Sequence, residues 1–445
     1  MTLARQNLIN GVLGGASRAV WSSTATVSTG CDSWSAQQYT DVSSQLIASL
    51  QSPLTWWAGL SGQTPIWVSN TGVSGQRIDQ WYARLPALLA DASKWLYWTT
   101  PQNSFGQAFG GYTAVGGPYA GQAITLTNVL AAVQAEMAGL IQATIRAGKT
   151  PIVLSCVGVS TWTATQLNIR NDYNTWLQAY CTATNSVFVD ARTVLTDGNL
   201  STATYKAGYE MPGGAAGHPS IIGSYFLGKA LWQTAAFSIM SARNLLPIST
   251  ASSQAFGTQI LLNNLFQNTD SGGILTGGTN SGFTGDAPLS FTSSIGSGTI
   301  SGVNSHTPAA VGNNLISTLT YGGTTTAETR FFQNPASGFP IVGQRLRGVV
   351  QYDVAANSVA LNGIHTQASF TIGGVTTTGI DGYALVANAG PLPSEAFTYT
   401  ALTPANLIVT SGTVTAVSWS TRGEYVGASG GSAVITQRQA ALYVN

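Results

Sequence analysis

The hydrophobic pattern of this chain changes near residue 250. Before that point, short apolar runs typical of strands alternate with longer amphipathic stretches typical of helices, and after it the helical period disappears. Such alternation predicts a parallel sheet flanked by helices. A chain of 445 residues is also long for a single hydrophobic core. Two domains are therefore expected, with a boundary between Leu246 and Phe256.

The first region contains five expected strands and five expected helices. The strands are Thr24–Thr29, Pro65–Ser69, Trp95–Trp98, Thr150–Ser155 and Ser186–Val189, and the helices are Ala36–Leu50, Gln76–Ala92, Thr127–Ala147, Ala164–Tyr180 and Ile221–Ala242. Ligands of open parallel sheets bind beyond the carboxyl ends of the strands. Ser33, Gly72 and Asn103 follow the first three strands, so we expect them to reach one crevice.

The second region consists of short runs rich in β-branched and aromatic residues, separated by Gly, Ser and Asn clusters. Examples are Leu315–Tyr321, Arg347–Val354, Ala368–Ile372, Asn406–Val409 and Thr413–Trp419. This pattern is typical of an all-antiparallel sandwich or barrel.

Charge excludes some partners. The formal net charge is +1, and charged residues make up only 7% of the chain, against about 25% in an average soluble domain. Such a surface offers no broad field for nucleic acid, and no stretch approaches the roughly 18 uncharged apolar residues of a membrane span. A neutral, hydroxyl-rich ligand or extensive subunit contacts fit it better.

The cysteines and two of the histidines indicate no metal or cofactor. Cys31, Cys156 and Cys181 are odd in number and widely spaced, which excludes a disulfide framework and matches no zinc pattern, so we expect free or buried thiols. His306 and His365 have no neighbouring Cys or paired carboxylates in the sequence. We interpret both as surface or core histidines.

One histidine stands apart. His218 is the only histidine in the first 250 residues, and Ser33 ends an apolar strand-like run far upstream. A serine hydroxyl is a poor nucleophile at neutral pH unless a base within hydrogen-bond reach takes its proton, and His218 is the obvious candidate. The pair predicts a serine hydrolase.

The sequence around these residues resembles a known family. Asp32-Ser33, Asn70–Gly75, Asn103 and His218-Pro219 occur in the order of the four sequence blocks of the SGNH (GDSL-type) hydrolases, over roughly residues 20–245. The resemblance implies an α/β fold with a flavodoxin-like three-layer parallel sheet, and an ester hydrolase that needs no cofactor. It also implies Ser33 as nucleophile, His218 as base, and an oxyanion hole made by the backbone N–H groups of Ser33 and Gly72 and the side-chain amide of Asn103.

These expectations define three segments. Residues 1–20 form an N-terminal segment, 21–248 an SGNH-like hydrolase domain expected to fold alone, and 256–445 an all-β sandwich, jelly-roll-like in type, for binding or oligomerisation.

The chain departs from the family pattern in three places. Cys31 separates Gly30 from the Asp-Ser pair, and Pro101–Ser104 replaces Gly-x-Asn-Asp. Ala215 stands where the family carries the aspartate that orients the histidine. Either a backbone carbonyl takes the imidazole N–H, which we favour, or Glu210 does. Asp190, at the end of the fifth expected strand, is interpreted as a structural cap.

The sequence also offers two other chemistries. Gly427–Gly431 fits the G-x-S-x-G elbow of α/β-hydrolases, but that elbow precedes a helix, whereas here strand-like residues follow Ser429. We interpret this segment as a hairpin turn. Paired acids for glycoside hydrolysis stay open, because proximity is invisible in the sequence.

Aromatic residues near the blocks suggest the substrate. They are Trp34, Trp56, Trp57, Trp67, Trp81, Tyr82 and Trp162, and such rings stack on sugars or fill the core beside the sheet. We expect Ser33 to remove O-acetyl or other small acyl groups from a polysaccharide, with small acyl esters as further substrates.

The layout resembles that of bacteriophage tail or capsid-surface proteins that recognise bacterial glycans. It predicts an extracellular or virion-associated protein that assembles as a homo-oligomer or in a virion through the β domain, and residues 1–10 make a poor secretory signal. The competing context is a secreted bacterial esterase. The alternative function is an inactive SGNH-like protein that binds glycan or has a structural role in the virion.

Overall fold

The chain forms two compact units. The computed structural model describes residues 25–42, 45–211, 217–234, 237, 240, 243, 245–249, 251, 253–254, 256–267, 274–323, 326–337, 339–358, 361–383, 391–405, 407–425 and 431–445. The first unit comprises Met1–Gln37, Thr64–Pro219 and Lys229–Ser241, and the second comprises Gln38–Gln63, Ser220–Gly228 and Ala242–Asn445. The division therefore differs from the expected single boundary near residue 250, because the chain enters the second unit three times.

A five-stranded parallel sheet forms the centre of the first unit. Its order is β4-β1-β5-β8-β9, with β1 at Thr26–Thr29, β4 at Ile66–Asn70, β5 at Trp95–Trp98, β8 at Thr150–Leu154 and β9 at Val187–Val189. All four neighbouring pairs are parallel. The five expected strands are thus confirmed, and their order is that of the flavodoxin-like sheet.

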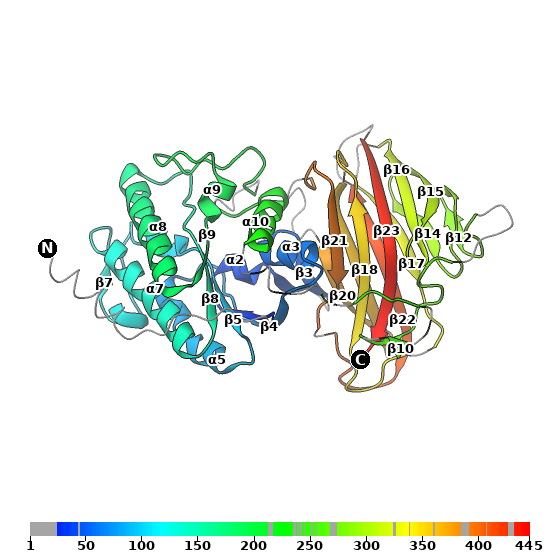
Figure 1. The fold of residues 1–445 in the computed structure, drawn as a ribbon, viewed down its shortest axis with the longest axis horizontal. Coiled ribbons are helices and arrows are strands. Elements are labelled where there is room, and N and C mark those ends of the chain that lie inside the picture. The colour runs from blue at the N-terminus through cyan, green and yellow to red at the C-terminus, as the bar shows by residue number, and fades with distance from the viewer. Residues whose placement is uncertain are drawn as a thin grey trace. The chain divides into compact units, whose positions relative to one another are not determined.

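Helices cover this sheet because its strands are apolar on both faces. On β5, Leu96 and Trp98 belong to a buried cluster shared with the long helices α7 (Val129–Arg146) and α8 (Ala164–Thr184). Trp95 alternates to the other face, where its ring lies 5.6 Å from that of Phe237. Figure 1 shows α7 and α8 side by side next to the sheet. The first unit is a three-layer α/β structure, as predicted.

Shorter elements complete the first unit. The expected helix Gln76–Ala92 is divided into α4 (Ile78–Trp81) and α5 (Leu85–Ala90), and the others are α2 (Ser33–Ala36), α6 (Gln102–Gln107), α9 (Ala191–Leu195), the 3₁₀ turn η1 (Gly117–Tyr119), and the hairpin β6 (Tyr112–Thr113) and β7 (Ala123–Ile124).

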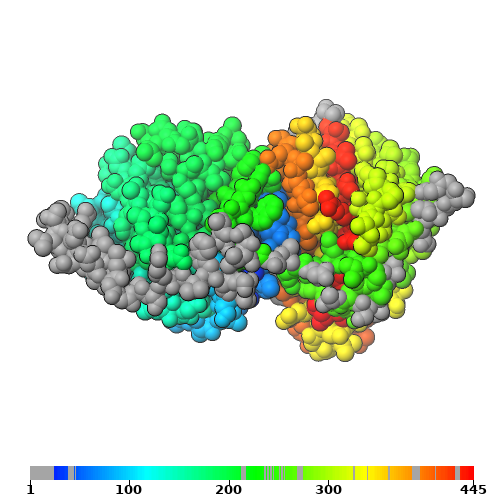
Figure 2. Space-filling model, in the orientation of Figure 1, coloured from blue at the N-terminus to red at the C-terminus, as the bar shows by residue number. Residues whose placement is uncertain are grey.

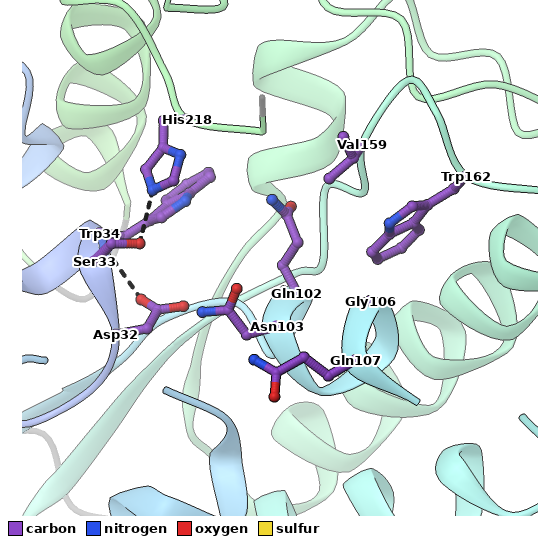
Figure 3. A pocket seen from close by; sticks show the side chains of 10 residues that line it. All are labelled: Asp32, Ser33, Trp34, Gln102, Asn103, Gly106, Gln107, Val159, Trp162 and His218. Carbon is purple, nitrogen blue, oxygen red and sulfur yellow. Dashed lines mark hydrogen bonds between the residues drawn. The ribbon is translucent and has the colours of Figure 1, made fainter. Parts of the chain in front are cut away.

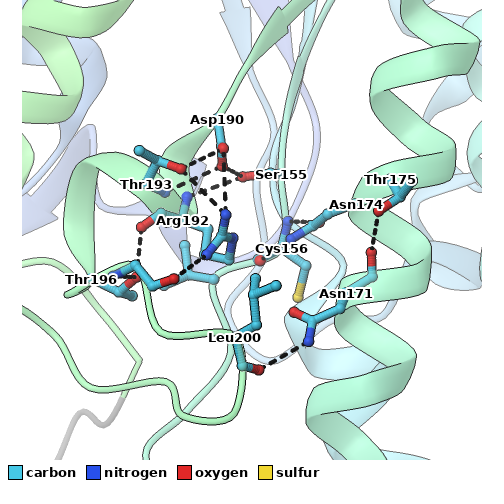
Figure 4. A network of polar contacts seen from close by, with 12 residues as sticks. Ser155, Cys156, Asn171, Asn174, Thr175, Asp190, Arg192, Thr193, Thr196 and Leu200 are labelled. Carbon is cyan, nitrogen blue, oxygen red and sulfur yellow. Dashed lines mark hydrogen bonds and ion pairs between the residues drawn. The ribbon is translucent and has the colours of Figure 1, made fainter.

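Asp190 caps α9, as predicted. Its carboxylate accepts hydrogen bonds from the Thr193 N–H and hydroxyl, at 3.2 and 2.6 Å, and from the Ser155 hydroxyl at 2.8 Å. Figure 4 shows this network at the ends of β8 and β9. Asp190 therefore joins two strand ends to a helix N-terminus.

The helix expected over Ala36–Leu50 is wrong. The segment forms strands β2 (Tyr39–Val42) and β3 (Gln45–Ser49), and β3 pairs in parallel with β20 (Val375–Tyr383). Pairing with a strand more than 300 residues away overrides the local helical spacing. A local sequence pattern cannot reveal such a contact.

Helix α3 (Pro53–Leu60) comes after β3, and both belong to the second unit. The Trp56 ring lies 5.5 Å from that of Tyr399 on β21 (Phe397–Leu402). A Cβ atom added to Gly59 would lie 2.0 Å from the Tyr399 ring, so glycine permits this close approach. Figure 2 shows the blue surface of this early segment against the orange surface of the late strands.

Two mixed sheets form the sandwich of the second unit. One has the order β12-β14-β17-β22-β19-β20-β3-β2; the other runs β10-β11-β23-β16-β15-β13, with β18 between β23 and β21. Their further bounds are β10 Ser253–Gln254, β11 Gly257–Gln259, β12 Thr279–Ser281, β13 Phe283–Gly285, β14 Thr292–Ser297, β15 Ile300–Pro308, β16 Asn313–Tyr321, β17 Ala327–Gln333, β18 Leu346–Val354, β19 Leu361–Ile372, β22 Val414–Tyr425 and β23 Gly431–Val444. The predicted β-sandwich is confirmed, although helix α3 also belongs to this unit.

Three details of the second region differ from expectation. The pairs β12–β14, β13–β15 and β20–β3 are parallel, so the unit is not all-antiparallel. In Asn406–Val409 the described residues make only an isolated bridge, at Ile408. Helix α10 (Ile221–Gln233) ends before the expected Ala242, and its first residues belong to the second unit. None of the helices among the described residues has the length and apolar character to cross a bilayer.

Candidate active site

A tight turn after β1 presents Ser33. Asp32 has an extended backbone and caps α2, where its Oδ1 accepts hydrogen bonds from the Trp34 N–H at 3.2 Å and the Thr99 hydroxyl at 2.9 Å. Ser33 is therefore the first residue of a helix at the carboxyl end of a central strand. A strand-turn-helix of this kind holds the serine oxygen at the edge of the sheet.

The extra residue in this turn is accommodated by Arg84. Its guanidinium donates hydrogen bonds to the carbonyl oxygens of Gly30, at 2.9 and 2.7 Å, and Cys31, at 3.2 Å. The buried Cys31 Sγ accepts from the Thr99 N–H at 3.3 Å, and burial raises the pKa of this thiol to about 11. Cys31 thus lengthens the turn after Gly30, and its thiol is buried.

The structure brings Ser33 and His218 together. The distance from Ser33 Oγ to His218 Nε2 is 2.7 Å, within hydrogen-bond reach (Figure 3). The two residues come from opposite ends of the first unit's sequence. Their arrangement is that of a nucleophile beside its general base.

Glu210 holds the backbone next to His218. Its Oε1 accepts a hydrogen bond from the Gly217 N–H at 2.8 Å, and the Met211 N–H donates to the His218 carbonyl oxygen at 2.9 Å. Ala215 lies outside the described residues. Glu210 therefore contacts the histidine loop through the main chain.

The three predicted oxyanion donors differ in their surroundings. Among the described residues, no partner accepts a hydrogen bond from the Ser33 backbone N–H. The Gly72 N–H donates to Asn70 Oδ1 at 3.0 Å, and the Asn103 amide donates to the Gln76 carbonyl oxygen at 3.1 Å. Asn103 retains a second N–H, whereas Gly72 must exchange its bond before it can serve an oxyanion.

Gly72 also has a steric role. A Cβ atom at this position would lie 2.4 Å from Ser35 Oγ and 2.7 Å from the Ala36 nitrogen. Only glycine at position 72 lets the loop after β4 pack this closely on the turn that carries Ser33.

Sequence reasoning missed Gln102. Its Nε2 donates to the Gly217 carbonyl oxygen at 3.1 Å, and its Oε1 accepts from the Gly158 N–H at 3.1 Å. Both partners are distant in sequence, so only the position beside Asn103 could have drawn attention to it. Gln102 ties the helix that carries Asn103 to the loop that carries His218.

A cavity of about 140 Å³ opens beside the Ser33–His218 pair. Its walls combine amide, aromatic and apolar groups (Figure 3): Asp32, Ser33, Trp34, Gln102, Asn103, Gly106, Gln107, Val159, Trp162 and His218. Asp32 is the one carboxyl group among these lining residues. A pair of acids for glycoside hydrolysis is therefore not present in this lining.

Two of the seven aromatic candidates line the cavity, Trp34 and Trp162. Trp56, Trp57 and Trp81 are fully buried. The Tyr82 hydroxyl donates to the Glu136 carbonyl oxygen at 2.6 Å, and Trp67 is half-buried on β4. Most of these aromatic residues therefore pack within the fold and do not line the cavity.

Burial shifts the acid-base properties of Asp32. The carboxyl is buried, and burial raises its pKa to about 7 in spite of the hydrogen bonds from Thr99 and Trp34, which lower it. Asp32, directly beside Ser33, therefore gains its charge only near neutral pH.

The remaining sequence candidates lie elsewhere. His306 Nδ1 is 2.7 Å from Asp286 Oδ2, and His365 is buried, which lowers its pKa to about 3. The three cysteines are free and buried, as predicted. No group of three or more His, Cys, Asp or Glu side chains suited to a metal ion occurs in the part of the chain that the structure describes.

The interpretation of Gly427–Gly431 as a hairpin turn is wrong. Residues 426–430, including Ser429, lie outside the described residues, but β22 before them and β23 after them belong to different sheets. The segment therefore connects the two sheets. A strand follows it, so the α/β-hydrolase elbow is still excluded.

Comparison with known proteins gives likenesses of fold. No protein-family model and no curated protein matches the sequence. Similar solved structures include one assigned to the G-D-S-L lipolytic family from Desulfitobacterium hafniense DCB-2, with 18% identity over 47% of this chain and 98% of that chain and a TM-score of 0.34. The acetyl xylan esterase AlAXEase is 13% identical over 46% of this chain and 98% of its own, with a TM-score of 0.34.

The family 11 carbohydrate-binding module of the Clostridium thermocellum cellulase Lic26A-Cel5E is also similar, with 16% identity over 35% of this chain and 89% of that chain and a TM-score of 0.22. The G-D-S-L structures cover the N-terminal half of this chain, and the carbohydrate-binding modules resemble its β-rich region. At these identities and TM-scores the likenesses carry no functional information about this chain.

Proposed function

We propose that the first unit is a serine ester hydrolase that removes acetyl or similar small acyl groups from a polysaccharide. The observation that carries this proposal is the 2.7 Å contact of Ser33 Oγ with His218 Nε2 at the wall of the cavity. The serine oxygen attacks the ester carbonyl while its proton passes to Nε2. The imidazolium then protonates the leaving alcohol, and water releases the acyl group from Ser33 with His218 again as base.

Negative charge develops on the carbonyl oxygen during the attack. The Ser33 N–H and the second N–H of Asn103 are the donors available to it, and a preorganised donor of this kind lowers the barrier by about 3 kcal/mol. Gly72 becomes a third donor when its bond to Asn70 is exchanged.

The lining of the cavity suits an ester of a small acyl group and a neutral alcohol. Its volume is about 140 Å³, and Trp162 offers a flat apolar wall, whereas Trp34 is almost fully buried. Asn103 and Gln107 supply amides that can bind hydroxyl groups. An acetylated sugar combines these features.

The test is hydrolysis of p-nitrophenyl acetate and of an acetylated polysaccharide by wild type and Ser33→Ala in parallel. The proposal predicts release of acetate by wild type from both substrates, and background rates for the variant. Equal rates in the two proteins would remove the esterase proposal.

One observation favours the alternative of an inactive glycan-binding protein. Two of the three predicted oxyanion donors, Gly72 and Asn103, already donate to protein oxygens. In that case acetylated polysaccharide binds both wild type and Ser33→Ala with equal affinity and is released unchanged.

We further propose an extracellular or virion context, in which the sandwich binds glycan or joins copies of the chain. The support is the layout, an α/β unit with a catalytic-type serine followed by a β-sandwich with few charges. Light scattering on the full chain tests the assembly, and a monomer at working concentration would contradict it.

A further inference from the structure

Gln102 uses both ends of its side-chain amide. It is almost fully buried at the edge of the cavity, where Nε2 donates to the Gly217 carbonyl oxygen and Oε1 accepts from the Gly158 N–H, each at 3.1 Å. The amide therefore joins the loop after β8 to the peptide unit directly before His218.

The two partners of this amide are glycines whose backbone conformations leave room for it. Gly217 and Gly158 have φ values of +82° and +91°, which side chains rarely adopt. A Cβ atom on Gly217 would lie 2.1 Å from Gln102 Nε2. No other residue at position 217 would leave room for the amide.

The peptide units around His218 are held on several sides. Glu210 Oε1 accepts from the Gly217 N–H, Gln102 donates to the Gly217 carbonyl oxygen, and Met211 donates to the His218 carbonyl oxygen. These bonds fix the planes of the peptide units on both sides of the histidine Cα. The direction in which the imidazole leaves the chain is thereby set by the main chain.

We infer that Gln102 is a positioning residue that aims the His218 imidazole at Ser33 by clamping the Gly217 carbonyl group. This inference rests on the proposed function. An aspartate three residues before the histidine would orient the imidazole by binding the ring itself. Here a buried amide orients it by binding the backbone.

The clamp requires a donor at one end and an acceptor at the other. An amide meets this need at every pH, whereas a carboxyl group meets it only when protonated, and methionine meets it at neither end. Gln102→Glu therefore separates the hydrogen bond from the volume of the side chain.

The experiment compares the kinetics of Gln102→Met, Gln102→Glu and wild type on p-nitrophenyl acetate between pH 5 and pH 8. Gln102→Met should lower kcat by about 10- to 100-fold with KM unchanged, since misplacement by about 1 Å costs rates of this order. The ratio of Gln102→Glu to wild type should rise at least about fivefold as the pH falls and the new carboxyl becomes a donor. A ratio independent of pH, or a kcat of Gln102→Met equal to wild type, would overturn the inference.

The matched control is Gln142→Ala. Gln142 is another buried glutamine of the first unit, and its Nε2 donates to the Tyr180 hydroxyl at 2.9 Å, away from the cavity lining. Its kinetics should stay within about twofold of wild type, because its hydrogen bond contacts neither the cavity lining nor the loop that carries His218.

Hydrogen exchange of the full chain gives a second readout that does not depend on turnover. The peptide containing Gly217 and His218 should exchange faster in Gln102→Met by about tenfold or more, and at the wild-type rate in Gln142→Ala. Unchanged exchange in Gln102→Met would overturn the clamp even if activity fell. Faster exchange in a protein whose wild type hydrolyses no ester would retain the clamp and reject the proposed function.

Discussion

The turn that carries Ser33 and the loop that carries His218 are held by different means. Around Ser33 the contacts start within the turn itself, where Asp32 caps the helix that Ser33 begins. Around His218 they come from side chains of other segments, with Gln102 on one side of Gly217 and Glu210 on the other. Ser33 is thus placed by local geometry, whereas His218 is placed by long-range hydrogen bonds to its backbone.

This difference teaches where variation in such a site is tolerated. The turn accommodates Cys31 because the Arg84 guanidinium donates hydrogen bonds to the carbonyl oxygens of Gly30 and Cys31. In the loop, the Gly217 N–H and carbonyl oxygen and the His218 carbonyl oxygen are held by Glu210, Gln102 and Met211.

The largest effect is expected from Ser33→Ala and His218→Ala. Each should lower kcat by on the order of 10⁴-fold or more, and the double variant should lose little beyond that, because neither group acts without the other. Steady-state kinetics on p-nitrophenyl acetate measure all three. Additive losses in the double variant would contradict a shared mechanism.

The next largest effect is expected from removal of the second region. A fragment of residues 1–248 keeps α3 but lacks β20 and β21, so β3 has no parallel partner and Trp56 loses its contacts with Tyr399 and Phe397. Because Gln38–Gln63 belongs to the second unit, the fragment should not unfold cooperatively, contrary to the expectation from sequence. Thermal unfolding followed by circular dichroism measures this, and a stable fragment with full activity on a small ester would refute it.

A moderate effect is expected at Glu210. Glu210→Gln keeps an acceptor for the Gly217 N–H and should lower kcat by less than about tenfold, whereas loss of a true triad acid costs on the order of 10⁴. Glu210→Ala, which removes the acceptor, should cost more than Glu210→Gln. A loss of the larger size in Glu210→Gln would make Glu210 the group that orients the imidazole.

A smaller effect, on stability, is expected from Asp32→Asn. The pKa of Asp32 in the folded chain, about 7, lies above the usual value of 3.8, so the folded state binds its proton more tightly than the unfolded state. This contribution is complete below about pH 4 and is lost as the pH rises through about 7. Urea unfolding should therefore show wild type losing stability relative to Asp32→Asn between pH 4 and pH 8. Parallel pH dependences in the two proteins would be the contrary result.

No effect on kcat is expected from Ser429→Ala. The segment Gly427–Gly431 connects two sheets of the second unit and precedes a strand. The same ester assay measures this variant, and a fall in kcat of more than about threefold would show that a second serine takes part.

Much of the first unit could be predicted from sequence because its strands and long helices carry local patterns. Trp95–Trp98 is a strand with the expected bounds, and Thr163 with Gln166 forms the capping box that begins α8. Ser33 and His218 were also found, through their residue types and order. The contact of Gln102 with Gly217 and the pairing of β3 with β20 escaped, since these partners lie more than 100 residues apart and leave no periodic trace.

The most direct measurement of the central claim is acid quenching of the reaction with p-nitrophenyl acetate, followed by peptide mass spectrometry. Attack by Ser33 with His218 as base predicts an acetyl group on the peptide that contains Ser33 in wild type, and none on that peptide in Ser33→Ala or His218→Ala. Acetylation at another residue, or an acetylated Ser33 peptide in His218→Ala at the wild-type level, would contradict a Ser33–His218 esterase.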